Sequence, residues 1–319
     1  MSIRVYITDN FERMSDTAAE IVVQELTGLL ARKDEAVLGL ATGNSPTGIY
    51  KRLAAAANAG AFDSTRVRSF NLDEYVGLPG ENAQQRLLHP ESYSYFMIRE
   101  LFGLLKRPFA ETSVPYGSLI DQVRMAQELD AHPADWRELG DDAGRSIVID
   151  PHAASEYLAW IRNEVLHGYE RKIARAGGID LQIIGVGGKG HVAFHESGIP
   201  FEGSRVLLVK LDDNTVTNAV IDGHFRAKED SPHYATSMGA ELVYEARTVL
   251  LVASGQRKAG PVARSLTEDP TPHVPISYGQ TYARRGGNLI YVLDKAAAQD
   301  LLGHEDALAR RGVVVTAVS

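Results

Sequence analysis

Short apolar runs alternate with segments of helical apolar spacing along most of this 319-residue chain. The apolar runs predict strands at residues 1–8, 36–40, 66–72, 181–186, 205–210, 248–253, 288–293 and 312–318. The helical spacing predicts helices at residues 16–30, 46–57, 92–105, 153–165, 258–266 and 296–302. Such alternation indicates an α/β fold with a largely parallel sheet that is covered by helices on both faces.

Residues 106–150 interrupt this alternation. The stretch is polar, has little apolar pattern and contains Pro108, Pro115 and Pro133. Irregular segments of this length are uncommon inside a compact core. We therefore expect one domain over residues 1–319, with an insertion or lid at about residues 106–150.

Three loops that follow predicted strands carry most of the candidate chemistry. They lie at residues 41–47, 73–75 and 185–196. In sheets of this class, ligands bind outside the carboxyl ends of the strands. We therefore expect the three loops to converge in space and to form the site.

The loop Gly185–Glu196 combines glycines with residues that bind anions and transfer protons. Its glycines match the spacing of a dinucleotide site, but the glycines and the proline within 198–203 interrupt the helix that such a site requires. His191 and His195 have a spacing seen in metal sites, but the order is not H-E-x-x-H and no helix is expected here. The remaining interpretation is a histidine acid/base that is oriented by a carboxylate, with neighbouring N–H groups available to an oxyanion.

The other two loops offer an anion site and a carboxylate. Residues 42–47 present backbone N–H groups, hydroxyls and the positive end of a helix, which suit a phosphate, although a plain capped turn has the same sequence. Asp73 and Glu74 supply carboxylates that can take and return a proton, or they cap the following loop. Lys258 begins a helix and either reaches an anion or lies in solvent.

The composition limits the partners. A net charge of -8 argues against nucleic acid or an anionic membrane, because phosphate backbones are bound through a surplus of Lys and Arg. A small anion held by a few local donors remains compatible with this charge. The chain has no cysteine, which excludes disulfides and thiolate chemistry. Apolar runs are too short to span a membrane and the N-terminus has no signal-peptide pattern, so we expect a cytoplasmic protein.

Four separated motifs resemble those of the glucosamine-6-phosphate deaminase family, whose fold group also includes 6-phosphogluconolactonase. They are LATGNSPT at 40–47, FNLDEYVGL at 70–78, HPESY at 89–93 and GVGGKGHVAFHE at 185–196, and GQRKA at 255–259 is a weaker fifth. The FNLDEY run favours deaminase over lactonase. The resemblance implies a modified Rossmann-like fold and a reaction without cofactor or metal, in which a hexosamine 6-phosphate (glucosamine 6-phosphate or an epimer) becomes a ketose 6-phosphate plus ammonia.

The resemblance also implies roles for individual residues. His191 would open the pyranose ring, Asp73 would move a proton between C2 and C1, and Glu196 would orient His191. The implied phosphate ligands are Thr42, Gly43, Asn44, Ser45 and Lys258, and further substrate contacts are expected at Glu74 and Gly187.

Several positions depart from the family pattern. Lys189 stands where these deaminases usually have Asp or Asn, and a cation there would disfavour protonated His191. We count Lys189 among the candidate catalytic residues, where it pairs with an anionic substituent of the substrate or points into solvent. His195 replaces an Asn. Ile221 aligns with a phosphate-binding arginine of the family, so Arg226 could replace that arginine only if the loop shifts.

Two other functions fit the same motifs. One is a sugar-phosphate lactonase, and the other is a sugar-phosphate sensor that has kept the fold and lost the chemistry. In each case the expected partner is a small sugar phosphate, and a homo-oligomer is compatible with the sequence.

Overall fold

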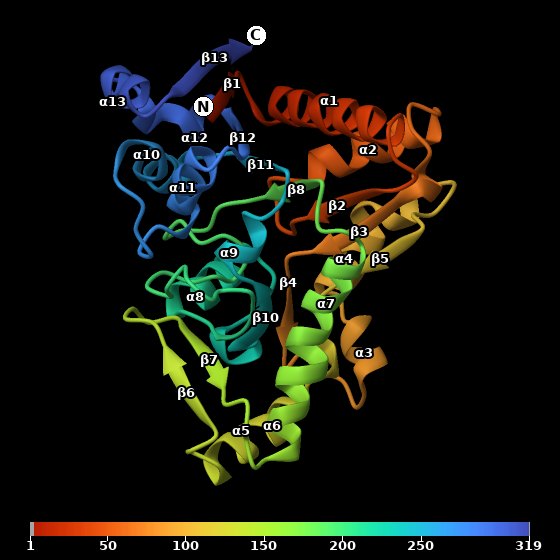
Figure 1. Ribbon diagram of the computed structural model, residues 1–319, viewed down its shortest axis with the longest axis vertical. Helices are drawn as coiled ribbons and strands as arrows, with labels where there is room; N and C mark the ends of the chain where they lie inside the picture. Colours follow the sequence, from red (N-terminus) through yellow and green to blue (C-terminus); the bar gives the residue numbers. More distant parts are fainter. Residues whose placement is uncertain (1–2, 319) are drawn as a thin grey trace.

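The main sheet has eight parallel strands in the order β13-β1-β12-β11-β8-β2-β3-β5 in the computed structural model, which describes residues 3–318 (Figure 1). The strands are β1 (Ile3–Thr8), β2 (Ala36–Leu40), β3 (Val67–Asn71), β5 (Glu111–Ser113), β8 (Leu181–Ile184), β11 (Thr248–Ala253), β12 (Asn288–Asp294) and β13 (Val313–Val318). The predicted α/β fold with a largely parallel sheet is confirmed. Residues 1–2 of the first predicted strand lie outside the described residues.

Helices cover both faces of this sheet because side chains alternate along its strands. On β11, Leu250 and Val252 belong to the apolar cluster beneath the N-terminal helices, whereas Val249 and Leu251 belong to the cluster on the opposite face. The N-terminal helices are α1 (Phe11–Leu30), α2 (Thr47–Asn58) and α4 (Tyr93–Glu100). The later helices are α6 (Glu156–Trp160), α7 (His167–Arg175), α10 (Ala259–Thr267), α11 (Tyr278–Arg284), α12 (Lys295–Ala298) and α13 (Glu305–Arg310).

The helix expected at residues 153–165 is longer than its pattern indicated. α6 passes through a wide turn at 161–166 into α7, which ends ten residues beyond the prediction at Arg175. Tyr169 and Ile173 continue the buried face, and the Tyr169 hydroxyl donates to the backbone oxygen of Asn71 at 2.7 Å. This helix therefore anchors the end of β3, from which the chain enters the site.

A second sheet of five antiparallel strands, β4-β10-β9-β7-β6, lies beyond the carboxyl ends of the first. Its strands are β4 (Asp73–Val76), β6 (Trp136–Leu139), β7 (Arg145–Ile149), β9 (Val206–Lys210) and β10 (Tyr234–Met238). The sequence analysis placed 205–210 in the parallel sheet and described 106–150 as irregular, and both descriptions were wrong. β6 has two exposed central residues, so its apolar pattern is too weak to recognise.

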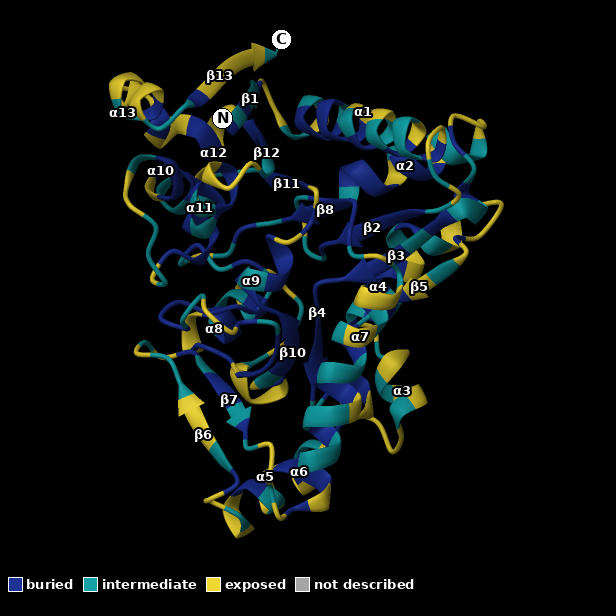
Figure 2. Cartoon of the chain, in the orientation of Figure 1, coloured by how far each residue is buried: buried dark blue, intermediate teal, exposed yellow. Residues whose placement is uncertain are grey.

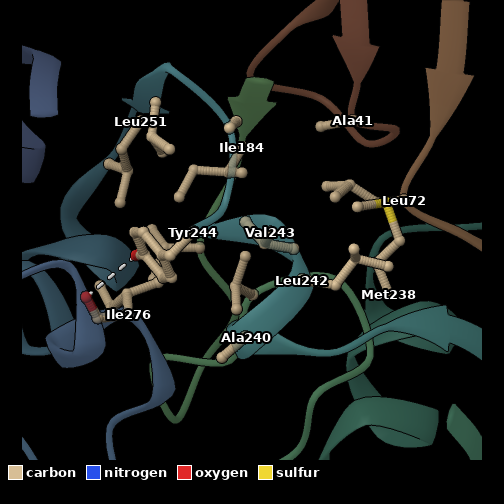
Figure 3. Packing of buried hydrophobic residues seen from close by; sticks show 14 of the residues in the cluster. Ala41, Leu72, Ile184, Met238, Ala240, Leu242, Val243, Tyr244, Leu251 and Ile276 are labelled. Atoms are coloured by element: carbon tan, nitrogen blue, oxygen red, sulfur yellow. Dashed lines mark hydrogen bonds between the residues drawn. The ribbon is translucent and has the colours of Figure 1, made fainter. Parts of the chain in front are cut away.

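The short helices of this region are α3 (Ala83–Leu87), α5 (Gln122–Ala131), α8 (Asp213–Ile221) and α9 (Ala240–Val243). Apolar side chains fill the space between the two sheets. Ala41 after β2 and Ile184 of β8 belong to the same cluster as Leu72 and Met238 at the junction with the second sheet, and the Tyr244 hydroxyl donates to the backbone oxygen of Ile276 at 3.1 Å (Figure 3).

Buried residues run continuously from the parallel sheet into the second sheet (Figure 2). The loops above this core therefore stand on a rigid base. Within residues 3–318, no helix is long and apolar enough to cross a membrane.

Candidate active site

A cavity of about 480 Å³ lies at the carboxyl ends of β2, β3, β8 and β11. Its walls include residues 41–45, 72–73, 185–188 and 254–258. The expected convergence of the three loops is therefore confirmed, and a fourth loop, which carries Lys258, joins them. The strands bring these loops together because parallel strands end at the same edge of the sheet.

Asp73 occupies the deep end of this cavity and is only 6% exposed. It is the first residue of β4, one residue after the chain leaves β3 through Leu72. Burial raises the pKa of the Asp73 carboxyl well above its ordinary value, the adjacent negative charge of Glu74 raises it further, and the Thr42 hydroxyl opposes both effects. A carboxyl of this kind holds its proton more tightly than an exposed one and can exchange it with a bound ligand.

Glu74 points away from the cavity and is fully buried. Its carboxylate accepts the backbone N–H groups of Tyr75, Tyr93 and Ser94 and the hydroxyl of Ser94, each at 3.0 Å. Burial raises the pKa of Glu74 to about 7, although these four donors lower it. A substrate contact was expected at Glu74, but the Glu74 side chain does not line the cavity. Glu74 instead fixes the start of α4 and thereby places Tyr93 in the cavity wall.

His191 faces the cavity, and the Glu196 carboxylate, which does not line the cavity, contacts the His191 ring. The Glu196 side chain is 1% exposed, and its Oε2 lies 3.2 Å from His191 Nδ1. With Nδ1–H donating to this carboxylate, Nε2 is left to exchange a proton with a ligand. Gly187 also lines the cavity, and a Cβ at this position would overlap the His191 ring. The glycine is therefore required by the placement of the histidine.

The loop that carries His191 is tightly wound. The His195 N–H donates to Val192 O at 2.9 Å, and Ala193 between them has a φ of 51°. Positive φ is uncommon for a residue with a side chain and marks stored backbone strain. Ala193 lines the cavity, so the strain lies at the site itself.

His195 serves the structure of this loop and does not reach the cavity. Its Nδ1 accepts the Ala240 N–H at 3.0 Å, and its Nε2 donates to Ile199 O at 2.9 Å. Burial lowers the pKa of His195 to about 4. Both ring nitrogens are thus used in a neutral side chain. In the described part of the chain, no group of three or more His, Asp or Glu side chains is arranged to hold a metal ion.

Lys189 and Arg226 lie outside the cavity wall. The Lys189 ammonium is 2.7 Å from Asp212 Oδ2 and 3.1 Å from Asp142 Oδ2, so it neither meets the substrate space nor points freely into solvent. Arg226 is exposed, and Ile221 at the aligned family position is also exposed. The loop shift that would bring Arg226 to the phosphate end is absent among the described residues.

A second part of the cavity wall is cationic and rich in backbone donors, and it adjoins Asp73 through the Thr42 hydroxyl. Residues Thr42–Ser45 form the turn before α2, and Gly43 has a φ of 100° that favours glycine. Lys258 stands at the start of α10, and burial together with the neighbouring charge of Arg257 lowers its pKa. Arg257 also lines the cavity and pairs with Asp222 at 2.7 Å. The predicted anion site thus has a second cation.

Sequence reasoning missed several residues of the wall. These are Tyr93, Thr215, Asn218, Asp222, His224 and Arg257. Arg257 stands next to the predicted Lys258, so its position in the same loop was a usable signal. The residues of α8 carry no local motif, because only the fold brings that helix to the cavity.

Curated relatives match nearly the whole chain. It is 31% identical over 298 residues to the glucosamine-6-phosphate deaminase of Clostridium botulinum (strain Loch Maree / Type A3), covering 93% of this chain and 98% of the relative. It is 34% identical over 296 residues to the glucosamine-6-phosphate deaminase of Rhodopirellula baltica, covering 93% and 95%. No family model matches the chain.

Solved structures share the fold. A monomeric glucosamine-6-phosphate deaminase of the NagB superfamily superposes with a TM-score of 0.69 at 23% identity, covering 94% of this chain and 100% of that one. The 6-phosphogluconolactonase of Thermotoga maritima has a TM-score of 0.59 at 18% identity, covering 92% and 100%.

The fold is therefore that of a class of α/β proteins that includes both sugar-phosphate deaminases and lactonases. Within this class the sequence is decisive, because the deaminases of known sequence match at more than 30% identity over almost all of both chains. The chain belongs to the glucosamine-6-phosphate deaminase family.

Proposed function

We propose that this protein converts a hexosamine 6-phosphate, glucosamine 6-phosphate or an epimer, into the ketose 6-phosphate and ammonia. The observation that carries the proposal is one cavity whose wall combines two groups of residues. One group is the buried Asp73 carboxyl with the His191–Glu196 pair, and the other is the Thr42–Ser45 turn with Lys258. An open-chain sugar phosphate has carbons on which the first group can act and a phosphate that suits the second.

The phosphate binds at the Thr42–Ser45 turn. Backbone N–H groups, the hydroxyls of Thr42 and Ser45 and the start of α2 favour an anion there. Lys258 supplies a positive charge from the facing loop. Burial disfavours the charged form of Lys258 and lowers its pKa. A phosphate dianion beside Lys258 compensates that charge and is therefore a favourable partner.

The chemistry begins with opening of the sugar ring. His191 moves a proton between the C1 hydroxyl and the ring oxygen, and Glu196 stabilises the charged imidazole while it does so. Asp73 then removes the C2 proton and returns it to C1, while a second proton passes from the amine nitrogen to O1, which converts the aldehyde and amine carbons into an alcohol and an imine. Water adds to the imine carbon at C2, and ammonia leaves. One water is consumed and one ammonia is released, with no net oxidation.

Removal of the C2 proton requires a neutral amine on the substrate and an ionised carboxylate on the protein. Asp73 must be ionised to take the C2 proton, and its raised pKa makes it a stronger base in that form. The enolamine that forms between the two carbon proton transfers is consumed when the same proton returns to C1. A single buried carboxyl is therefore sufficient for removal of the C2 proton and its delivery to C1.

A panel of hexosamine 6-phosphates tests the proposal, with ammonia and ketose 6-phosphate measured together. We expect both products in equal amounts from at least one amino sugar, and a loss of both in Asp73→Asn. Arg226→Ala is the matched control, because Arg226 is exposed and lies outside the cavity. Hydrolysis of 6-phosphogluconolactone without ammonia release would instead identify a lactonase. Thermal stabilisation by a hexose phosphate without turnover would identify a sensor.

A further inference from the structure

Lys189 lies at the centre of a group of charges that the proposed reaction does not use. Its ammonium contacts Asp142 from the connection between β6 and β7 and Asp212 from the start of α8. The three residues are distant in sequence, since Asp142 lies 47 positions before Lys189 and Asp212 lies 23 positions after it. Hydrogen bonding to Asp212 raises the pKa of Lys189, so the side chain is charged at neutral pH.

Asp212 connects this group to the catalytic pair. Its side chain is 3% exposed, and its Oδ1 accepts the Asn214 N–H at 2.7 Å, which caps α8. Its own backbone N–H donates to Glu196 Oε1 at 3.3 Å, while Glu196 Oε2 contacts His191. The position of Asp212 therefore fixes one oxygen of the carboxylate that orients the histidine.

The connection between β6 and β7, which are neighbouring strands (Figure 1), lies against the loop that carries Glu196. A Cβ at Gly144 would overlap the Glu196 side chain, so the hairpin backbone lies directly against it. Asp141 N–H donates to Gly198 O at 3.3 Å. Hydrogen bonds from the Ser197 hydroxyl and the Ala143 N–H, with Lys189, lower the pKa of Asp142 to about 2. Asp142 is thus ionised and available to the lysine.

We propose that Lys189 is a positioning residue that clamps Asp142 of the β6–β7 hairpin and Asp212 of α8 together and so holds Glu196 against His191. The inference rests on the proposed function, since it assigns Glu196 and His191 to catalysis. Without a cation, the carboxylates of Asp142 and Asp212 would repel each other next to a third buried carboxylate, that of Glu196. The lysine allows all three to remain in place.

Substitution Lys189→Met tests this clamp. We expect kcat to fall by about tenfold to a hundredfold with KM within twofold of its original value, because displaced catalytic groups lose rate without losing the phosphate site. Lys189→Arg restores most of the rate, because the guanidinium reaches both carboxylates. Lys210→Met is the matched control. It removes an exposed lysine that bonds Glu138 of the same hairpin at 3.5 Å and touches neither Asp142 nor Asp212.

A second readout works without turnover. The ¹⁵N shifts of the His191 ring, assigned by their loss in His191→Asn, report which nitrogen carries the proton. We expect an Nδ1–H tautomer in the unmodified protein and a mixture in Lys189→Met. Asp142→Asn gives the same direction of change with a smaller amplitude, and it provides the test if Lys189→Met fails to fold.

The outcomes separate the two proposals. If the unmodified protein releases no ammonia, the proposed function fails, and the His191 tautomer still decides whether the clamp exists. If Lys189→Met keeps both its rate and its His191 signals while the unmodified protein turns over, the clamp is wrong. A lower melting temperature with an unchanged tautomer and an unchanged kcat would mean that Lys189 only stabilises the fold, which also overturns the inference.

Discussion

The wall of the cavity contains two groups of residues that are built by different means. The phosphate end comprises the Thr42–Ser45 turn, which offers backbone donors and hydroxyls, and the cations Arg257 and Lys258 from a neighbouring loop. The buried end comprises Asp73 and Glu196, two carboxyls that are almost completely buried, together with His191. The two groups meet at Thr42, whose hydroxyl bonds Asp73.

This difference separates binding from proton transfer. A phosphate needs charge and donors that are ready before it arrives, which a helix start and two cations supply. A proton shuttle needs a carboxyl whose affinity for a proton has been raised, and burial does this. Substitutions at the phosphate end should therefore alter KM, whereas substitutions at the buried end should alter kcat.

The largest expected effect is that of Asp73→Asn. Removal of the carboxyl should lower kcat by about a thousandfold, in the range observed for acid–base groups, with little change in KM. Kinetics with the best substrate of the panel measure both values. Asp130→Asn serves as a control, because Asp130 is an exposed acid on α5. A KM effect larger than the kcat effect would break the division between the two ends.

Asp73→Asn should also change the thermal stability of the protein in a pH-dependent way. The folded pKa of Asp73 is raised, so its contribution to stability is full below the ordinary carboxyl value of 3.8 and is lost as pH rises through the folded pKa. Asp73→Asn should therefore melt at a higher temperature than the unmodified protein at pH 7, and the difference should shrink near pH 4. A variant that is less stable at pH 7 would contradict the role of burial.

At the phosphate end, Lys258→Met should raise KM about thirtyfold, which corresponds to about 2 kcal/mol for a charged hydrogen bond. Arg257→Met should raise KM only about threefold, because Arg257 is largely exposed and already pairs with Asp222. Inhibition by inorganic phosphate should weaken in the same order. Equal effects of the two substitutions would show that Arg257 leaves Asp222 and binds the phosphate fully.

Substitution of His195 should have the smallest effect on catalysis. It should instead change how stability depends on pH. Its folded pKa of about 4 lies below the ordinary 6.5, so the unfolded chain binds a proton first as pH falls. Stability should fall by up to about 3 kcal/mol between pH 6.5 and pH 4. Urea unfolding should show that His195→Asn loses this dependence while His152→Asn, at an exposed histidine, keeps it. The same pH dependence in both variants would contradict the assignment.

Much of the parallel sheet and the convergence of its loops could be predicted from the sequence. Thr42, Asp73 and His191 each follow a short apolar run, and parallel strands bring such positions to one edge. Spacing and residue type sufficed because these signals are local.

The second sheet could not be predicted in the same way. Its strands are four or five residues long, and β4 with β10 and β7 with β9 pair across long stretches of chain, so the strand order depends on contacts that no local pattern records. The direction of the Lys189 side chain could not be predicted for the same reason, because its partners Asp142 and Asp212 lie 47 and 23 positions away in sequence. The side chain of Glu74 lies away from the cavity because successive side chains of a strand point to opposite faces, and Asp73 has the face toward the cavity.

The most direct test of the central claim follows the proton that Asp73 is proposed to carry. A hexosamine 6-phosphate that is deuterated at C2 is converted in ordinary water, and the ketose 6-phosphate is examined at C1 by mass spectrometry and NMR. Transfer by one buried carboxyl predicts ammonia in an amount equal to the ketose and a measurable share of the deuterium at C1. Ketose and ammonia with no deuterium at C1 under any condition would contradict the single-carboxyl shuttle, and absence of both products would contradict the proposed function.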